Sequence, residues 1–269
     1  MRSMDVENIG ETLEDGGEHR IHLCGRLTLR LAGSRLEETL PGRQGRMLFA
    51  YLVAQRARPT PRALLYGVLW PESAPAAAES ALAALLAKLR RTLGAAVLTG
   101  KQEIHLALPK GAWVDIEAAS EGLHRAESAM AQRDWAGAWG PARVALHIAA
   151  RTFLPGYEAA WIEAIRRRLE HVLVRAHECV AASGIGMGGA EIATAERSAR
   201  CLVELAPLHE SGYRFLMQAL ALRDNIGEAL MVYEQLRRVL RAELGVSPGA
   251  ATQALHARLL KDGSRAPAQ

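Results

Sequence analysis

The chain has 269 residues, of which 49 % are hydrophobic and only 5 % aromatic, and its formal net charge is +4. This length and apolar content suffice for two packed domains, and the abundance of Ala, Leu, Arg and Glu favours helix over sheet. Three scattered cysteines argue against a disulfide framework or a zinc site, and the lack of a long apolar segment argues against export or membrane spanning, so we expect a cytoplasmic protein without membrane partners.

Charge is distributed unevenly along the chain. Residues 1–19 carry one Arg against six Asp and Glu and have few apolar anchors, which predicts a disordered acidic tail. From 20 to 116 there are fourteen Lys and Arg against six Asp and Glu, a net charge of +8. Such a basic excess indicates a phosphate-binding surface, because polyanion affinity comes largely from the release of condensed counterions. A basic surface without a partner is the alternative.

The first ordered region begins with strands and continues with helices. Residues 21–33 alternate apolar and polar side chains, which predicts a small antiparallel sheet. The next elements are predicted, in chain order, as helices over 42–55, 60–70 and 76–93 and a strand hairpin over 96–116. The second helix is expected to begin with Thr60 as its N-cap and Pro61 in its first position. This order predicts a winged helix-turn-helix domain over residues 20–116, preceded by a small sheet.

The third helix is the candidate recognition helix, because its leucines form one apolar stripe at roughly 100° per residue. The residues on the opposite side are Ser80, Ala84, Ala87, Lys88 and Arg91. A narrow face with a basic end suits a major groove, with Lys88 and Arg91 at phosphates and the two alanines against thymine methyl groups. Arg90 lies between the two faces, within reach of the DNA backbone. Alternatively, these cations only complement the dipole of the helix.

From residue 117 onward the chain is nearly neutral and helical throughout. Helices are predicted over 117–132, 134–149, 157–183, 188–206, 208–223, 225–244 and 248–261. An offset of 34 residues, the tetratricopeptide period, superposes Ala195 on Ala229 and Leu202 on Leu236. We therefore expect an all-α tetratricopeptide-like domain over 117–262 and a flexible tail over 263–269, with an ordinary antiparallel helical bundle as the alternative.

Several sequence blocks in this order resemble the SARP-type bacterial transcriptional regulators, in which an OmpR-type winged helix precedes a bacterial transcriptional activation domain. The blocks include GRQGRMLFAYLV, ALLYGVLWPES, LAKLRRTLG and GEALMVYEQLRRVLRAELGVSPG. The resemblance implies an activator that binds promoter repeats in double-stranded DNA, forms a homodimer and recruits RNA polymerase. It also implies DNA contacts by Arg43 and Arg46, by Lys88, Arg90 and Arg91, and by Lys101 in the wing.

One block departs from the family pattern. The stretch ALAALLA at 81–87 lacks the polar residues that relatives place in the middle of the recognition helix, so no side chain there can form a bidentate hydrogen bond with a base. Sequence preference would then depend on the wing, DNA shape and site spacing. The alternative is a protein-interaction or ligand-sensing helical-repeat module with a degenerate winged helix.

No other motif predicts chemistry. The GIGMGG stretch at 184–189 joins two predicted helices instead of following a strand, so we interpret it as a turn and not as a nucleotide site. Trp135, Trp139, Trp161 and Tyr157 gather near the start of the helical domain, where they fill the core or line a ligand pocket. The sequence contains neither GxSxG nor HExxH, and we expect no enzymatic activity and no cofactor.

Overall fold

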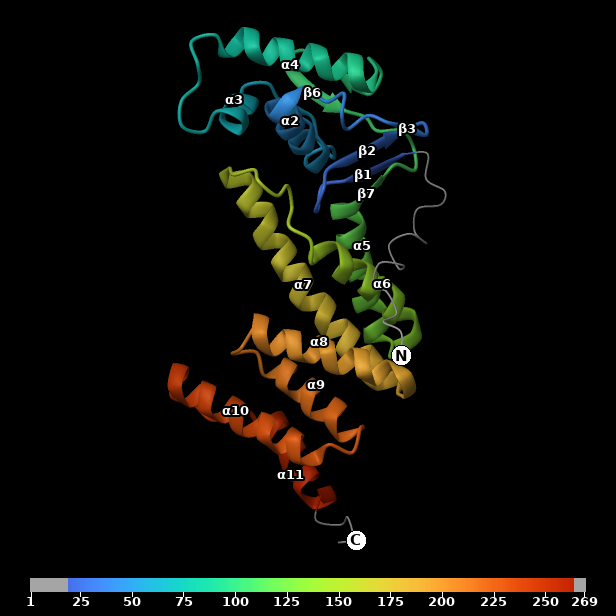
Figure 1. Cartoon of the computed structure of the whole chain (residues 1–269), viewed down its shortest axis with the longest axis vertical. Coiled ribbons are helices and arrows are strands. Elements are labelled where there is room, and N and C mark those ends of the chain that lie inside the picture. Colours follow the sequence, from blue (N-terminus) through green and yellow to red (C-terminus); the bar gives the residue numbers. More distant parts are fainter. Residues whose placement is uncertain (1–18, 264–269) are drawn as a thin grey trace, which may run out of the picture. The chain divides into compact units, whose positions relative to one another are not determined.

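The computed structural model describes residues 19–263, and these residues form a mainly helical protein with a small β part, as predicted (Figure 1). Contacts divide the chain into two compact units. The first contains the residues up to Glu117 together with Arg151–Arg167, and the second contains Ala118–Ala150 and the residues from Arg168 onward. The predicted tails lie outside the described residues, except for His19 and Gly263. The domain boundaries after residues 116 and 262 stay predictions.

A four-stranded sheet opens the first unit. Its strands are β1 (Arg20–His22), β2 (Thr28–Leu31), β3 (Ser34–Arg35) and β7 (Trp113–Val114), in the order β3-β2-β1-β7. Ile21 of β1 pairs antiparallel with Leu29 and parallel with Val114, and all three side chains are buried. The alternating pattern therefore predicted the first strands correctly, whereas the return of the chain into the same sheet at β7 was not predicted.

Three helices and a second sheet follow. The elements are α2 (Gly42–Ala54), β4 (Thr60–Pro61), α3 (Leu64–Leu69), α4 (Ala78–Leu93), β5 (Leu98–Thr99) and β6 (Glu103–Leu106). The β5–β6 hairpin is the predicted wing. The prediction that Thr60 caps the second helix is wrong, because Thr60 pairs with Ile104 of β6 and the amide of Arg62 donates to the oxygen of Gln102. These bonds keep the chain extended, and α3 begins only at Leu64.

The helical part agrees with the predicted order. Its elements are α5 (Asp115–Ala131), α6 (Trp135–Ala149), α7 (Ala160–Met187), the short 3₁₀ turn η1 (Gly189–Glu191), α8 (Ile192–Leu205), α9 (Glu210–Ala221), α10 (Ile226–Leu244) and α11 (Ala250–Gly263). Helices α8 to α11 pack against their neighbours in succession (Figure 1). The superposed pairs Ala195/Ala229 and Leu202/Leu236 are all buried, as a tetratricopeptide-like repeat requires.

The interpretation of GIGMGG as a turn needs correction. The first four residues of this stretch belong to α7, and only Gly188 and Gly189, with φ of 74° and 62°, form the turn. Gly186 packs so closely on Trp135 that a Cβ there would lie 2.5 Å from the indole ring. Of the four aromatic residues, Trp135 and Trp139 belong to the second unit, and Tyr157 and Trp161 belong to the first.

Asp115, the first residue of α5, holds the end of β1 in place. Its Oδ2 accepts hydrogen bonds from the amides of Leu23 at 2.7 Å and Cys24 at 2.8 Å. Burial raises the pKa of Asp115 to about 6, and the hydrogen bonds from the main chain counteract part of this increase. Cys24 also forms a β-bridge with Phe153, which attaches the segment after α6 to the first unit. This attachment explains why residues 151–167 belong to the first unit.

Candidate DNA-binding surface

Helix α4 separates its side chains into a buried stripe and an exposed face. Leu82, Leu86, Leu89 and Leu93 are buried, whereas Leu85 is half-buried at the edge of the stripe. The exposed side chains are Glu79, Ser80, Ala83, Ala84, Ala87, Lys88 and Arg91. The helical spacing therefore placed the outward residues correctly. Because most of them are small, the exposed face brings the helix backbone close to whatever lies against it.

The two cations on this face, Lys88 and Arg91, have no side-chain partner among the described residues. The acidic residue of α4 is Glu79, and its carboxylate accepts hydrogen bonds from Arg62 at 3.1 Å and from the Tyr66 hydroxyl. The hydrogen bond from Tyr66 and the charge of Arg62 lower the pKa of Glu79. Lys88 and Arg91 form no hydrogen bond or ion pair within residues 19–263. Their charges are therefore available to an external anion.

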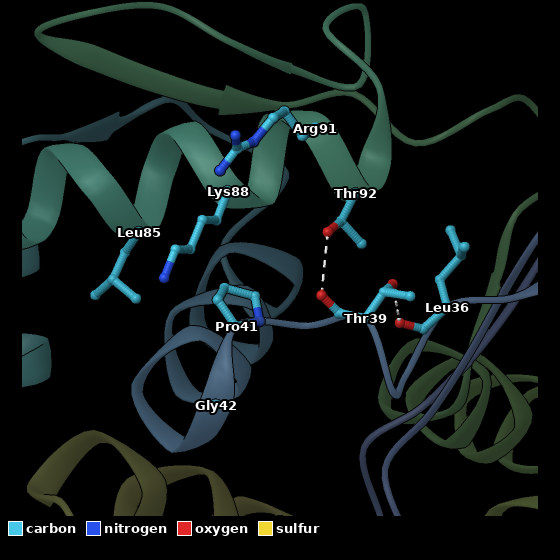
Figure 2. A pocket seen from close by; sticks show the side chains of 8 residues that line it. All are labelled: Leu36, Thr39, Pro41, Gly42, Leu85, Lys88, Arg91 and Thr92. Atoms are coloured by element: carbon cyan, nitrogen blue, oxygen red, sulfur yellow. Dashed lines mark hydrogen bonds between the residues drawn. The ribbon is translucent and has the colours of Figure 1, made fainter.

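A hollow of about 700 Å³ lies beside this face (Figure 2). Leu85, Lys88, Arg91 and Thr92 of α4 line one side, and Leu36, Thr39, Pro41 and Gly42 line the other. The Thr92 hydroxyl donates to the main-chain oxygen of Thr39 at 3.2 Å and so joins the two sides. We call this feature the α4–α2 hollow. No sequence signal indicated it, because Thr39 and Thr92 are 53 residues apart.

The wing is attached to α4 through Arg90. Its Nε donates to the oxygen of Leu98 at 3.2 Å, and its Nη2 donates to the oxygen of Gly100 at 2.5 Å. Gly100 has a φ of 88°, and a Cβ there would lie 1.7 Å from the oxygen of Glu103, so the turn requires glycine. Lys101 follows in this turn and is exposed. Arg90 therefore positions the wing, whereas the Lys101 side chain at its tip has no bonding partner within residues 19–263.

The two arginines of α2 lie against a different segment. Arg43 donates from Nη2 to the oxygen of Gly156 at 2.6 Å, and its Cζ lies 4.4 Å from the centre of the Tyr157 ring. Arg46 borders a smaller hollow of about 270 Å³ that is also lined by Tyr157. The structure therefore groups Lys88 with Arg91 at the α4–α2 hollow, and it directs Arg43 and Arg46 toward the chain around residue 156.

Arg166 is a structural residue that the sequence did not reveal. It belongs to the run Arg166, Arg167 and Arg168, whose pattern alone is typical of a solvated helix face. In the structure it donates to the main-chain oxygens of Phe153, Leu154 and Tyr157 at 2.9–3.0 Å, and it pairs with Glu163 at 2.6 Å. Arg166 thus fixes the segment that Arg43 contacts.

Residues 19–263 show neither a candidate metal site nor a helix that could cross a membrane. No group of three or more His, Cys, Asp and Glu side chains in this range could hold a metal ion. None of the helices described there has the length and apolar character needed to cross a membrane.

Comparison with known proteins gives a family match in the helical part. Residues 114–260 match the model of the bacterial transcriptional activator domain. The chain is 29 % identical over 250 residues to the regulatory protein AfsR of Streptomyces coelicolor, covering 92 % of the chain and 25 % of AfsR. It is 27 % identical over 247 residues to the transcriptional regulatory protein EmbR of Mycobacterium tuberculosis, covering 89 % of the chain and 62 % of EmbR.

The fold is also similar to a solved structure. The structure of Mycobacterium tuberculosis EmbR in complex with a low-affinity phosphopeptide superposes with a TM-score of 0.76 at 22 % identity, covering 91 % of this chain and 65 % of that one. This likeness shows a shared fold. The chain spans less than two thirds of the length of each of these relatives.

Proposed function

The chain belongs to the family of proteins with a bacterial transcriptional activator domain, and from this premise we propose that it is a transcription regulator that binds double-stranded DNA. The match covers residues 114–260, more than half of the chain, and confirms the resemblance to SARP-type regulators. AfsR and EmbR carry the names of regulatory proteins, which supports the regulatory role. The DNA-binding role depends on the first unit.

The observation that supports it most strongly is the exposed face of α4. Lys88 and Arg91 are exposed there without partners in the part of the chain that the structure describes, and Glu79 is already bound by Arg62 and Tyr66. Cations that are free in the folded protein can bind phosphates without breaking an existing ion pair. The small residues Ser80, Ala84 and Ala87 lie between these cations and the start of the helix, and they let α4 approach the base edges in a major groove.

The remaining predicted contacts receive different roles in this proposal. Lys101 binds a phosphate from the tip of the wing, and Arg90 holds the wing in position. Arg46 is exposed and remains a proposed phosphate contact. Arg43 reaches DNA only after its guanidinium leaves Gly156 and Tyr157.

We place protein contacts, including a homodimer and RNA polymerase, on the second unit. Large apolar side chains are exposed near the ends of α8 and α10, namely Leu205, Leu208, Leu244 and Val246. The loop after α10 is bonded to the start of α9, because the amide of Gly249 donates to the Glu210 carboxylate at 2.9 Å. Exposed apolar surface is typical of protein interfaces. Analytical ultracentrifugation of Leu208→Asp beside the wild type tests whether these side chains support a dimer.

A mobility-shift experiment tests the proposed function. The wild-type protein is titrated onto duplexes from the region upstream of its own operon over a series of salt concentrations. A shifted band that weakens steeply with salt is expected, because each neutralised phosphate releases counterions. Lys110→Ala is the control variant and should bind like the wild type, because it removes a cation outside α4 and outside the wing tip.

A protein-interaction or ligand-sensing module is the second candidate. The absence of hydrogen-bonding side chains from residue 81 to 87 favours it, because α4 then lacks direct base readout. Recovery of a stable protein partner together with no shift on any duplex supports this second candidate and contradicts the first.

A further inference from the structure

We propose that the α4–α2 hollow is a seat for one backbone phosphate of the DNA. The inference rests on the DNA-binding function proposed above and adds a defined contact to it. Lys88 and Arg91 would then act together on one phosphate, instead of contacting two separate phosphates along the strand.

The lining of the hollow has the charge that a phosphate requires. Lys88 and Arg91 both line it, and no carboxylate is among its lining residues. In Figure 2 the Lys88 side chain extends from α4 into the space beside Pro41, next to Leu85. Two cations around one anion give stronger attraction than either alone.

The side opposite the cations adds positive potential. Helix α2 begins at Gly42, which lines the hollow. The Gly42 amide donates to the oxygen of Leu40, so α2 contributes through the positive end of its dipole. Pro41 lies directly on Gly45, where a Cβ would be only 2.2 Å from the proline ring, so this edge is fixed by packing. The start of α2 strengthens a site that the two cations define.

The two sides of the hollow are held together before DNA binds. The Thr92 hydroxyl donates to the oxygen of Thr39, and the Thr39 hydroxyl donates to the oxygen of Leu36 at 2.8 Å. These bonds fix the segment that faces Lys88 and Arg91. A preformed site loses little conformational entropy on binding, so the contact is stronger than that of two cations on separate mobile segments.

Single-phosphate neutralisation tests the seat. A duplex is first selected from a randomised pool with the wild-type protein. Each of its phosphates is then replaced in turn by an uncharged methylphosphonate, and affinities are measured by fluorescence anisotropy. The proteins are the wild type, Lys88→Ala, Arg91→Ala, Thr92→Val and Lys101→Ala. Circular dichroism confirms that each variant is folded.

At one phosphate per bound protein, neutralisation should weaken wild-type binding by about tenfold, the effect of losing a charge-assisted contact. The same neutralisation should reduce the affinity of Lys88→Ala and Arg91→Ala by less than about threefold. Each variant has already lost part of its contact with that phosphate, and contacts to a shared group are not additive. Thr92→Val removes no charge and should also show a reduced effect. Lys101→Ala, which changes a cation outside the hollow, should retain the full tenfold loss.

If neutralising each phosphate weakens the binding of Lys88→Ala and Arg91→Ala by the same factor as that of the wild type, the two side chains do not share a phosphate. This result contradicts the phosphate site and leaves the DNA-binding function intact. Failure of the wild type to bind any duplex would instead contradict the proposed function itself. The two failures are therefore distinguishable in one data set.

Discussion

The guanidinium of Arg90 donates a hydrogen bond to the main-chain oxygen of Gly100 at 2.5 Å and so connects α4 to the turn between β5 and β6. The neighbouring residue Arg91 points outward and has no partner among the described residues. Two adjacent arginines therefore have different environments, one bonded within the protein and one exposed.

Arg90→Ala should lower the free energy of unfolding by about 1 kcal/mol or more, because the oxygens of Leu98 and Gly100 lose their donor. Arg91→Ala removes the same charge and should change stability by less than about 0.5 kcal/mol. Urea unfolding monitored by circular dichroism compares the two variants. Equal losses of stability would show that Arg90 does not hold the wing.

Arg166→Ala should destabilise the protein by about 2 kcal/mol or more, since three main-chain oxygens lose a donor in a part-buried site. Arg167→Ala is the matched control, because Arg167 is the next residue and is exposed. Thermal and urea unfolding measure both. If the control is as unstable as Arg166→Ala, the role assigned to Arg166 is wrong.

Gly186→Ala should destabilise the second unit by about 1–3 kcal/mol, because the new methyl group would meet the Trp135 ring at 2.5 Å. This effect on stability is opposite to the usual one, since alanine normally stabilises a helix relative to glycine by roughly 0.5–1 kcal/mol. Gly227→Ala in α10 should show the usual sign, because the added Cβ meets nothing within 4 Å and no proline follows it. Stabilisation by both substitutions would contradict the packing of Trp135 on α7.

The Asp115 carboxyl should give the protein a recognisable pH dependence. Its pKa is raised from 3.8 to about 6 by burial, so between these values the folded state binds the proton more strongly than the unfolded state. Its contribution to stability therefore increases as the pH falls from 7 to 4.5, by on the order of 2 kcal/mol.

Asp115→Asn, which cannot ionise, isolates this effect. The difference in unfolding free energy between the wild type and Asp115→Asn should be larger at pH 4.5 than at pH 7. Equilibrium urea unfolding at both pH values measures it. The opposite trend would place the pKa of Asp115 below its ordinary value. Glu37 and Glu196 have lowered pKa values and weaken the fold in acid, but they are common to both proteins.

The sequence predicted those parts of the structure that depend on local periodicity. The outward face of α4 follows from the spacing of its leucines, and the helices from α5 to α11 follow from repeated apolar stripes. Such patterns are fixed by neighbours within one or two helical turns. They therefore survive folding with only small changes at the helix ends.

Features that depend on distant partners were not predictable in the same way. Thr60 and Pro61 have the residue types of a helix start, but pairing with β6 makes them a strand. Asp115 binds amides that are 91 and 92 residues away, and no local signal identifies them. The different environments of Arg90 and Arg91 likewise depend on the position of the wing relative to α4. Within the candidate site, sequence alone identified the cations but not the hollow that Lys88 and Arg91 share.

The central claim is that α4 binds DNA through Lys88 and Arg91, and the salt dependence of affinity tests it most directly. The dissociation constant for a bound duplex is measured by fluorescence anisotropy from low to high salt for the wild type and the double variant Lys88→Ala/Arg91→Ala. The slope of log affinity against log salt should fall in magnitude by between about 0.9 and 1.8, for one shared or two separate phosphates. An unchanged slope in a correctly folded double variant would contradict the account.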